Sequence, residues 1–260
     1  MPRQSGYTLI ELIMVIVLLS IVATVSVRFV GLSTQGALDT SARQLRALQS
    51  VVISEQLTRD LREAFPLSIR STGSCIEWLP MEAGTNYLNP PATEVNQIEI
   101  AEFAQSPAFN NKRVVIYGYG TSTGDVYTGA NPGPVSSAVS GINNTASSGL
   151  PATISLSANH RFDTTSPAQR LFLVGEPVSI CQSGRFLYRY SGYAPTSIQP
   201  DPPAVTPEVL AASVTGTVNF RFQPASLQRA AVVQFTFDLV SADGSETTTV
   251  SQEVQIRNVP

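Results

Sequence analysis

The stretch GYTLIELIMVIVLLSIVATVSV, residues 6–27, decides the architecture at the start of the chain. Its only charged residue is Glu11. As a helix, the uncharged residues 12–27 would span about 24 Å, which is short of a hydrocarbon core of about 30 Å. Counted from Tyr7, the same helix reaches about 31 Å. The stretch therefore predicts a membrane-spanning helix that holds Glu11 inside the bilayer or at its margin.

The six residues before this helix, MPRQSG, do not have the order of a secretory signal peptide. In a signal peptide the small-residue cleavage site follows the apolar region, whereas here Gly6 precedes it. An ordinary signal anchor remains the alternative interpretation. Arg3 before the helix favours an N-terminus in the cytoplasm, but Arg28 after the helix weakens this positive-inside signal.

The sequence GYTLIE (residues 6–11), with the apolar run behind it, resembles the class III leader of type IV prepilins and type II secretion pseudopilins. The resemblance implies that residues 1–6 are a leader peptide and that a prepilin peptidase cuts between Gly6 and Tyr7. It also implies that Tyr7 becomes the N-methylated first residue. Most relatives have Phe at that place, and we do not expect Tyr to block processing.

Glu11 is the candidate assembly residue. A carboxylate near the bilayer interior costs about 2.5–3.5 kcal/mol on insertion scales unless it is paired. After cleavage the nearest new cation is the amine of Tyr7, one helical turn away. The amine of a neighbouring subunit could neutralise Glu11 instead, and we expect this pairing to guide subunits into register, as the resemblance implies. The alternative is that Glu11 only reaches back to the lipid headgroups.

Beyond the membrane segment, residues 7–30, apolar residues recur at mostly three- to five-residue spacing and predict an amphipathic continuation of the helix over residues 31–66. Pro66 is expected to end it. The weakest part is residues 31–41, whose glycines and threonines favour a break or partial melting. The apolar positions are Leu38, Ala42, Leu45, Leu48, Val52, Leu57, Leu61 and Phe65.

Residues 67–260 alternate between apolar runs and polar turns, which predicts a β-rich head. The clearest alternation places Val233, Phe235, Phe237 and Leu239 on one face of a strand. Hairpin turns are expected at 182–185 and at 241–245, which contains Asp-Gly. Such hairpins build a largely antiparallel sheet that buries one face on the helix, so the predicted fold class is α+β, with a long N-terminal helix packed on a β-sheet head. The expected strands are 76–80, 97–103, 113–118, 152–157, 170–174, 177–181, 186–191, 215–222, 231–240 and 247–257.

Two stretches are predicted to be flexible loops. Residues 118–150 are rich in Gly, Ser, Thr and Asn, and residues 193–207 contain prolines that a central strand would not tolerate. The sequence GYGTSTG at 118–124 lacks the ending of a phosphate-binding loop, and no helix is expected after it, so we expect a plain turn. His160 lies between loop residues and is expected at the surface. Trp78 and the tyrosines of 187–193 could form a sugar-stacking platform, but we expect them to pack in the core or at a sheet edge.

Composition argues against an ordinary soluble enzyme. Charged residues make up 13% of the 260 residues, about half the usual ~25%. The net charge is −3, and there is no basic stripe that would hold a nucleic acid. One His and two Cys are too few ligands for a protein-only zinc site. The sequence shows no convergent set of His, Cys or carboxylates, so we expect no catalytic residue, metal or cofactor.

Cys75 and Cys181 are the only cysteines in the chain. The membrane helix places the head outside the cytoplasm, where a disulfide is the natural state of two cysteines. The bridge would tie the segment after the helix to a sheet hairpin. Two separate buried thiols are the alternative.

Further patches resemble the MshO-type minor pilins of the mannose-sensitive haemagglutinin (MSHA) pilus. They are LREAFPLSIR (61–70), CIEWLP (75–80), PVSICQSGRFLYRYSGY (177–193) and VQIRNVP (254–260). The hairpin and the C-terminal strand also resemble the larger minor pseudopilins of type II secretion. The MSHA resemblance implies a low-copy subunit that primes assembly of the pilus or sits near its tip.

The resemblance also implies partners and a location. We expect the partners to be prepilin peptidase, other major and minor pilins, the inner-membrane assembly platform and inner-membrane lipid, and we expect no nucleic acid. The chain would cross the bacterial inner membrane once, with its N-terminus in the cytoplasm and its head in the periplasm, and then enter an adhesive fibre at the cell surface. Two alternatives remain: a minor pseudopilin of a type II secretion system, and a membrane-anchored sugar-binding adhesin.

Overall fold

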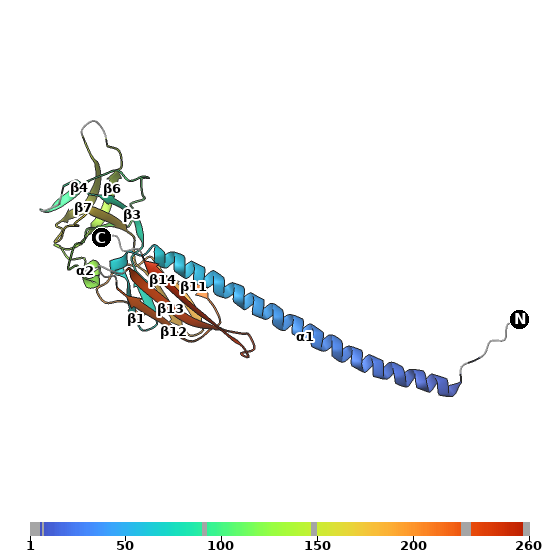
Figure 1. Cartoon of the computed structure of the whole chain (residues 1–260). Helices are drawn as coiled ribbons and strands as arrows, with labels where there is room; N and C mark the ends of the chain where they lie inside the picture. Colours follow the sequence, from blue (N-terminus) through green and yellow to red (C-terminus); the bar gives the residue numbers. More distant parts are fainter. Residues whose placement is uncertain (1–5, 7, 90–92, 147–149, 225–229, 257–260) are drawn as a thin grey trace. The chain divides into compact units, whose positions relative to one another are not determined.

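The computed structural model describes residues 6, 8–89, 93–146, 150–224 and 230–256 (Figure 1). The chain divides into two compact units, residues 1–49 and residues 50–260. The described part of the first unit is helical, and the second contains the end of the helix and the strands. The chain therefore has the predicted α+β architecture of a long N-terminal helix followed by antiparallel sheets.

Helix α1 (Leu9–Arg62) runs without a break through residues 31–41. The expectation of a break was wrong because the hydroxyl groups in this region bond to the helix itself. Thr34 Oγ1 donates to the Val30 carbonyl at 2.9 Å, and Thr40 Oγ1 donates to the Gly36 carbonyl at 2.8 Å. A glycine costs only about 1 kcal/mol relative to Ala, which is too little to interrupt a helix of 54 residues.

The helix ends at Arg62, a little before Pro66, which was predicted to stop it. Phe65 is extended, with φ −67° and ψ 117°, because a residue that precedes a proline avoids the helical region. Its N–H donates to the Leu79 carbonyl at 2.8 Å, so the end of the helix is joined to the residue that follows strand β2 (Cys75–Trp78). The short 3-10 helix η1 (Pro66–Ser68) follows.

The described strands form three antiparallel sheets. In chain order they are β1 (Arg70–Thr72), β2 (Cys75–Trp78), β3 (Met81–Asn86), β4 (Val95–Ile100), β5 (Arg113–Val115), β6 (Val135–Asn143), β7 (Ala152–His160), β8 (Arg170–Val174), β9 (Val178–Ser183), β10 (Phe186–Tyr190), β11 (Glu208–Ala211), β12 (Val214–Gln223), β13 (Ala231–Val240) and β14 (Thr247–Ile256). The sheets have the orders β1-β2-β9-β10-β11, β12-β13-β14 and β3-β8-β5-β6-β7-β4. Strands β8 and β13 have their predicted bounds, whereas β1, β3, β6 and β11 were not predicted.

The last turns of α1 cover the sheets through one apolar stripe. Ile53, Leu57 and Leu61 are 7%, 0% and 0% exposed and share a core with β2, β9, β10, β12, β13 and β14. Leu48 and Val52, which belong to the predicted apolar series, are 63% exposed. The predicted series therefore combined residues from two faces of the helix. Residues spaced irregularly by three to five positions do not stay on one face, whereas the buried residues recur every four and do.

Strand β13 lies at the centre of this core and confirms the predicted alternation. Both predicted hairpins are also present, because β13 pairs with β14 and β9 pairs with β10, each antiparallel. The four side chains of this predicted face are at most 2% exposed; they are Val233, Phe235, Phe237 and Leu239.

The six-stranded sheet closes on itself into a small barrel. Its two edge strands, β3 and β4, meet at a bridge between Tyr87 and Ile100, and the Leu88 N–H donates to the Glu99 carbonyl at 2.9 Å. The interior is filled by apolar side chains from all six strands and their connections. This barrel, built by residues 81–174, is an insertion between β2 and β9, which are neighbours in the five-stranded sheet.

The predicted loop at 118–150 contains two elements that the sequence did not indicate. They are helix α2 (Thr123–Thr128) and strand β6. Strand β6 was missed because it is made mostly of small or polar residues; only Val135 and Val139 are buried in the cores, and Ile142 packs against one of these cores while partly buried. Residues 193–207, all of which the structure describes, contain neither helix nor strand, as their prolines predict.

Candidate functional site

Helix α1 begins just after the predicted cleavage point, and Thr8 stands at its N-cap. Thr8 Oγ1 accepts a hydrogen bond from the Glu11 N–H at 3.4 Å, and the Thr8 carbonyl accepts from the Glu11 and Leu12 N–H groups at 3.1 and 3.2 Å. The contacts of Glu11 satisfy an N–H group that a helix otherwise leaves unpaired at its start, and the bond from Leu12 is the first regular bond of the helix. Sequence reasoning missed this role of Thr8, although Thr8 and Glu11 have the T-x-x-E spacing of a capping box.

Glu11 lies exposed in the first turn of α1. A carboxylate is favoured there by the positive end of the helix dipole. Gly6, on the leader side of the predicted cut, is also exposed. Tyr7 lies outside the described residues. The cut, the methylation of Tyr7 and the pairing of Glu11 with a neighbour therefore stay predictions.

The first part of α1 is long and apolar enough to cross a membrane. It contains an 18-residue window with a mean hydropathy of 2.7, none of which is buried. Its two hydroxyl groups in mid-segment are satisfied within the helix, because Ser20 Oγ donates to the Ile16 carbonyl at 2.7 Å and Thr24 Oγ1 to the Ser20 carbonyl at 2.8 Å. An apolar surface of this size is unfavourable in water, so the segment requires lipid or other apolar helices around it.

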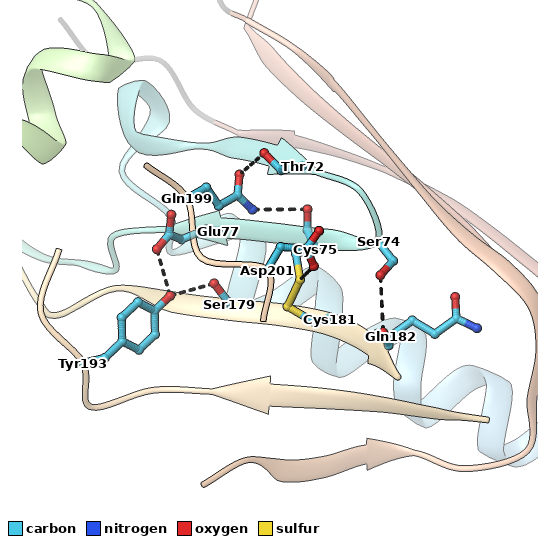
Figure 2. Close-up of a disulfide and its surroundings, with 10 residues drawn as sticks. All are labelled: Thr72, Ser74, Cys75, Glu77, Ser179, Cys181, Gln182, Tyr193, Gln199 and Asp201. Atoms are coloured by element: carbon cyan, nitrogen blue, oxygen red, sulfur yellow. Dashed lines mark hydrogen bonds between the residues drawn. A yellow bond between two sulfur atoms is a disulfide. The ribbon is translucent and has the colours of Figure 1, made fainter. Parts of the chain in front are cut away.

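Cys75 on β2 and Cys181 on β9 form the predicted disulfide (Figure 2). The two residues face each other in the antiparallel β2–β9 pair and are 0% and 1% exposed. The barrel leaves from the other end of the same two strands, where Trp78 pairs with Val178. The disulfide therefore fastens the two strands from which the barrel is inserted.

A charged network is buried on the same face of the sheet. Glu77 is fully buried, forms an ion pair with Arg70 and accepts the Tyr193 hydroxyl at 2.9 Å. Burial raises the pKa of Tyr193, so the phenol stays protonated and donates to Glu77. The Ser179 hydroxyl lies 2.6 Å from the phenol oxygen and donates to it in turn. These partners are required because an uncompensated buried charge is strongly destabilising.

Residues 193–201, which we call the strap, cross this face of the five-stranded sheet (Figure 2). The guanidinium of Arg70 donates to the Ser197 carbonyl at 2.9 Å and to the Thr196 carbonyl at 2.7 Å. It also lies over the ring of Tyr127 on α2, with 3.6 Å between Cζ and the ring centroid. A single arginine thus connects β1, the strap and α2.

The Gly-rich residues 118–124 form a turn and the first residues of a short helix. They lead directly into α2, contrary to the expectation that no helix follows. Ser122 caps this helix and forms a reciprocal capping box with Asp125, whose pKa is lowered by hydrogen bonds from the backbone and hydroxyl of Ser122. The helix has six residues, and the box engages the N–H groups of Ser122 and Asp125.

His160 was expected at the surface, and this was wrong. It is 3% exposed because β7 continues three residues beyond the predicted strand and ends at this histidine. Its Nε2 lies 2.9 Å from the Gly133 carbonyl, and its ring packs edge-on against Phe162. Trp78 is in the core, as predicted, on the opposite sheet face from Tyr190, so the two cannot share a sugar-stacking platform.

Cys75, Cys181 and Asp201 are the only group among the described residues whose ligand atoms approach one another closely enough for a metal ion. Both sulfur atoms belong to the disulfide and provide no thiolate. These three residues are therefore not a metal site.

Residues 1–27 match the family described as the prokaryotic N-terminal methylation motif. No curated protein and no solved structure matches the chain. The motif is that of prepilin-type proteins, so the match supports a type IV pilin-like protein. It implies processing by prepilin peptidase and assembly with other pilins, and together with the apolar helix it indicates membrane anchoring.

Proposed function

We propose that the chain is a minor pilin of an MSHA-like type IV pilus, without catalytic activity, that takes part in priming pilus assembly. Prepilin peptidase removes residues 1–6, the amine of Tyr7 is methylated, and the apolar helix passes from the inner membrane into the helical bundle of the fibre. The head lies in the periplasm before assembly and at the cell surface afterwards. The observation that carries this proposal is a methylation motif at the start of an apolar helix that is uncovered within the chain.

The uncovered helix supports transfer between two surroundings. Lipid tails are about as apolar as a leucine side chain, so neighbouring apolar helices can replace lipid around the segment at little cost. The backbone groups of a helix are paired internally, and these bonds persist in either environment. Ser20 and Thr24 donate to backbone carbonyls of α1, so their hydroxyl groups need no hydrogen-bond partner outside the helix.

Glu11 favours the fibre over the lipid surroundings of the helix. Among the described residues no side chain pairs with it, so its carboxylate is available to a neighbouring subunit. In lipid an unpaired carboxylate costs about 2.5–3.5 kcal/mol, and the amine of Tyr7 in an adjacent subunit would remove this cost. The pairing fixes the axial register of one helix against the next.

Two features support a low-copy subunit rather than the bulk fibre protein. Sequence patches along the head resemble MshO-type minor pilins, and the head is large for a repeated fibre subunit. The inserted barrel of residues 81–174 accounts for much of this size.

Intact mass and N-terminal peptide mapping of the protein from inner membranes and from sheared surface fibres test the proposal. We expect a species that begins at N-methyl-Tyr7 in both fractions, with few copies in the fibre. Deleting the pilus assembly platform should remove the protein from the fibre fraction while type II secretion continues. A chain that keeps Met1 or Pro2 and stays in the membrane would overturn the proposal.

The role of Glu11 has its own test. Glu11→Ala should be cleaved and methylated normally but should be absent from fibres, because only the assembly contact is lost. Glu55→Ala is the matched control, since Glu55 is an exposed carboxylate later in the same helix. Normal incorporation of Glu11→Ala would show that the carboxylate does not guide assembly.

A further inference from the structure

The disulfide lies beneath the strap. Figure 2 shows Gln199 and Asp201 of the strap beside Cys75. The Gln199 side chain accepts a hydrogen bond from the Thr72 hydroxyl at 3.1 Å and donates to the Cys75 carbonyl at 3.3 Å. Gln199 is 9% exposed and the two cysteines are almost fully buried. The strap thus forms one wall of the space that encloses the sulfur atoms.

The first half of the strap is held by buried charge. Tyr193 donates to the buried carboxylate of Glu77, and Arg70 donates to two strap carbonyls. Lifting the strap would remove the Tyr193 hydroxyl from Glu77, so this buried carboxylate would lose one of its hydrogen-bond donors. Hydrogen bonds to charged groups are stronger than neutral ones, so this end is the firmer attachment.

Asp201 brings a negative charge to the disulfide. Its Oδ1 lies 2.9 Å from Sγ of Cys75. The turn before β2 contains Gly73, at φ 57°, and a Cβ at this position would crowd the Asp201 carboxylate, so glycine leaves room for the approach. A carboxylate in this position repels an incoming thiolate, and it disfavours the thiolate that Cys75 would become when the bridge is cleaved.

We propose that the strap is a lid that seals the Cys75–Cys181 disulfide against thiol reductants, and that Asp201 adds an electrostatic barrier to the steric one. The reductants concerned are dithiols and thiol oxidoreductases, whose thiolate must approach along the axis of the S–S bond. With the strap closed, the join between the sheet and the barrel stays oxidised even in the presence of such thiols.

The reaction that the seal slows is thiol–disulfide exchange. A thiolate of the dithiol attacks Sγ of Cys181 and forms a mixed disulfide. The S–S bond breaks, and its electron pair leaves on Sγ of Cys75, which takes a proton from water. The second thiol of the reagent loses its proton, displaces the Cys181 thiolate and closes a cyclic disulfide. The dithiol is oxidised by two electrons, and the protein is reduced by two.

The test is the rate at which dithiothreitol reduces the full chain in detergent micelles, quenched with N-ethylmaleimide and read by mass. Tyr193→Phe keeps the ring but removes the hydroxyl that holds the strap, and reduction should be about tenfold faster. Asp201→Asn keeps the shape and removes the charge, and reduction should be about three- to tenfold faster. Ile198→Ala is the control, since this strap residue is 83% exposed and its truncation should leave the rate unchanged.

Urea separates opening of the strap from unfolding of the whole head. If reduction needs only opening of the strap, little surface is exposed, and the rate of reduction should rise only weakly with urea concentration. If reduction needs unfolding of the whole head, the logarithm of the rate should rise with urea as steeply as the free energy of unfolding falls. Fluorescence of Trp78 confirms that each variant is folded. Wild-type rates for both Tyr193→Phe and Asp201→Asn, or a wild-type rate that follows the full unfolding slope, would overturn the proposal.

Discussion

Replacing both cysteines, Cys75→Ala/Cys181→Ala, should lower the free energy of unfolding by about 4.7 kcal/mol. The two residues are 106 positions apart, and opening a loop of about this length returns roughly 16 cal/mol/K of chain entropy to the unfolded state. Alanine is the suitable replacement because the bridge is buried beside Tyr190, and a small apolar side chain introduces no unpaired polar group there. The bridge should therefore account for a large share of the stability of the head.

Trp78 provides the assay. It is the single tryptophan and is 1% exposed, so its fluorescence reports unfolding of the head. In urea, with a slope of about 2–3 kcal/mol per molar, the midpoint for the full chain in detergent should fall by about 2 M. Wild-type protein unfolded with a phosphine reductant should reach the same midpoint, because it lacks the same bridge. A loss below about 1 kcal/mol would refute the entropy argument and would mean that the unfolded chain keeps positions 75 and 181 close together.

Two further predictions concern the helix contact and a turn. Leu57→Ala removes a side chain that is 0% exposed and should cost about 2–5 kcal/mol in urea unfolding. Leu48→Ala, on the exposed side of the same helix, should change stability by less than about 0.5 kcal/mol, and equal losses would contradict the observed packing. Asp243 accepts hydrogen bonds from Ser241 and Ser245, which lower its pKa from 3.8 to about 2. Its contribution should therefore be complete above pH 4 and be lost as the pH falls through about 2. Amide hydrogen exchange in the β13–β14 hairpin measures this loss, and Asp243→Asn should remove the pH dependence.

Local patterns were sufficient for the helix and for the clearest strands. The apolar run of residues 6–27 and the alternation in β13 are each contained in one stretch of chain, so no distant contact had to be known. The hairpins were predictable for the same reason, because a short polar turn fixes which strands pair. The two faces of α1 beyond residue 31 were harder to separate, since an exposed apolar stripe and a buried one have similar spacing.

The barrel could not be predicted, because it depends on contacts that are remote in sequence. Strands β3 and β6 contain few large apolar residues, and their side chains become interior only when other strands close around them. The barrel closes where the edge strands β3 and β4 meet, at the bridge between Tyr87 and Ile100, and no local sequence pattern predicts this pairing. His160 was placed at the surface for the same reason, since its burial depends on this closed sheet.

The strap and the charged network beneath it were predictable only in part. A period of two in β2 places Cys75 and Glu77 on one face and Ile76 and Trp78 on the other, and this could have been inferred from CIEW alone. The contact between Glu77 and Tyr193 could not be inferred in this way, because Tyr193 is 116 residues further along the chain. A charged residue inside an otherwise apolar strand is the signal that would have pointed to a buried partner.

The two faces of β2 explain why the bridge and the strap are where they are. Strand β2 has only four residues, yet with β9 it must hold a barrel of six strands on the sheet that packs against the end of α1. Ile76 and Trp78 are committed to the apolar core beneath that helix. Any further fastening by side chains of β2 must therefore come from its other face, and that face carries the disulfide and the ion pair of Glu77. Because so short a strand offers few ladder hydrogen bonds, a covalent bridge sealed from reductants adds to the apolar contacts by which Phe65 and Leu79 hold the barrel strands.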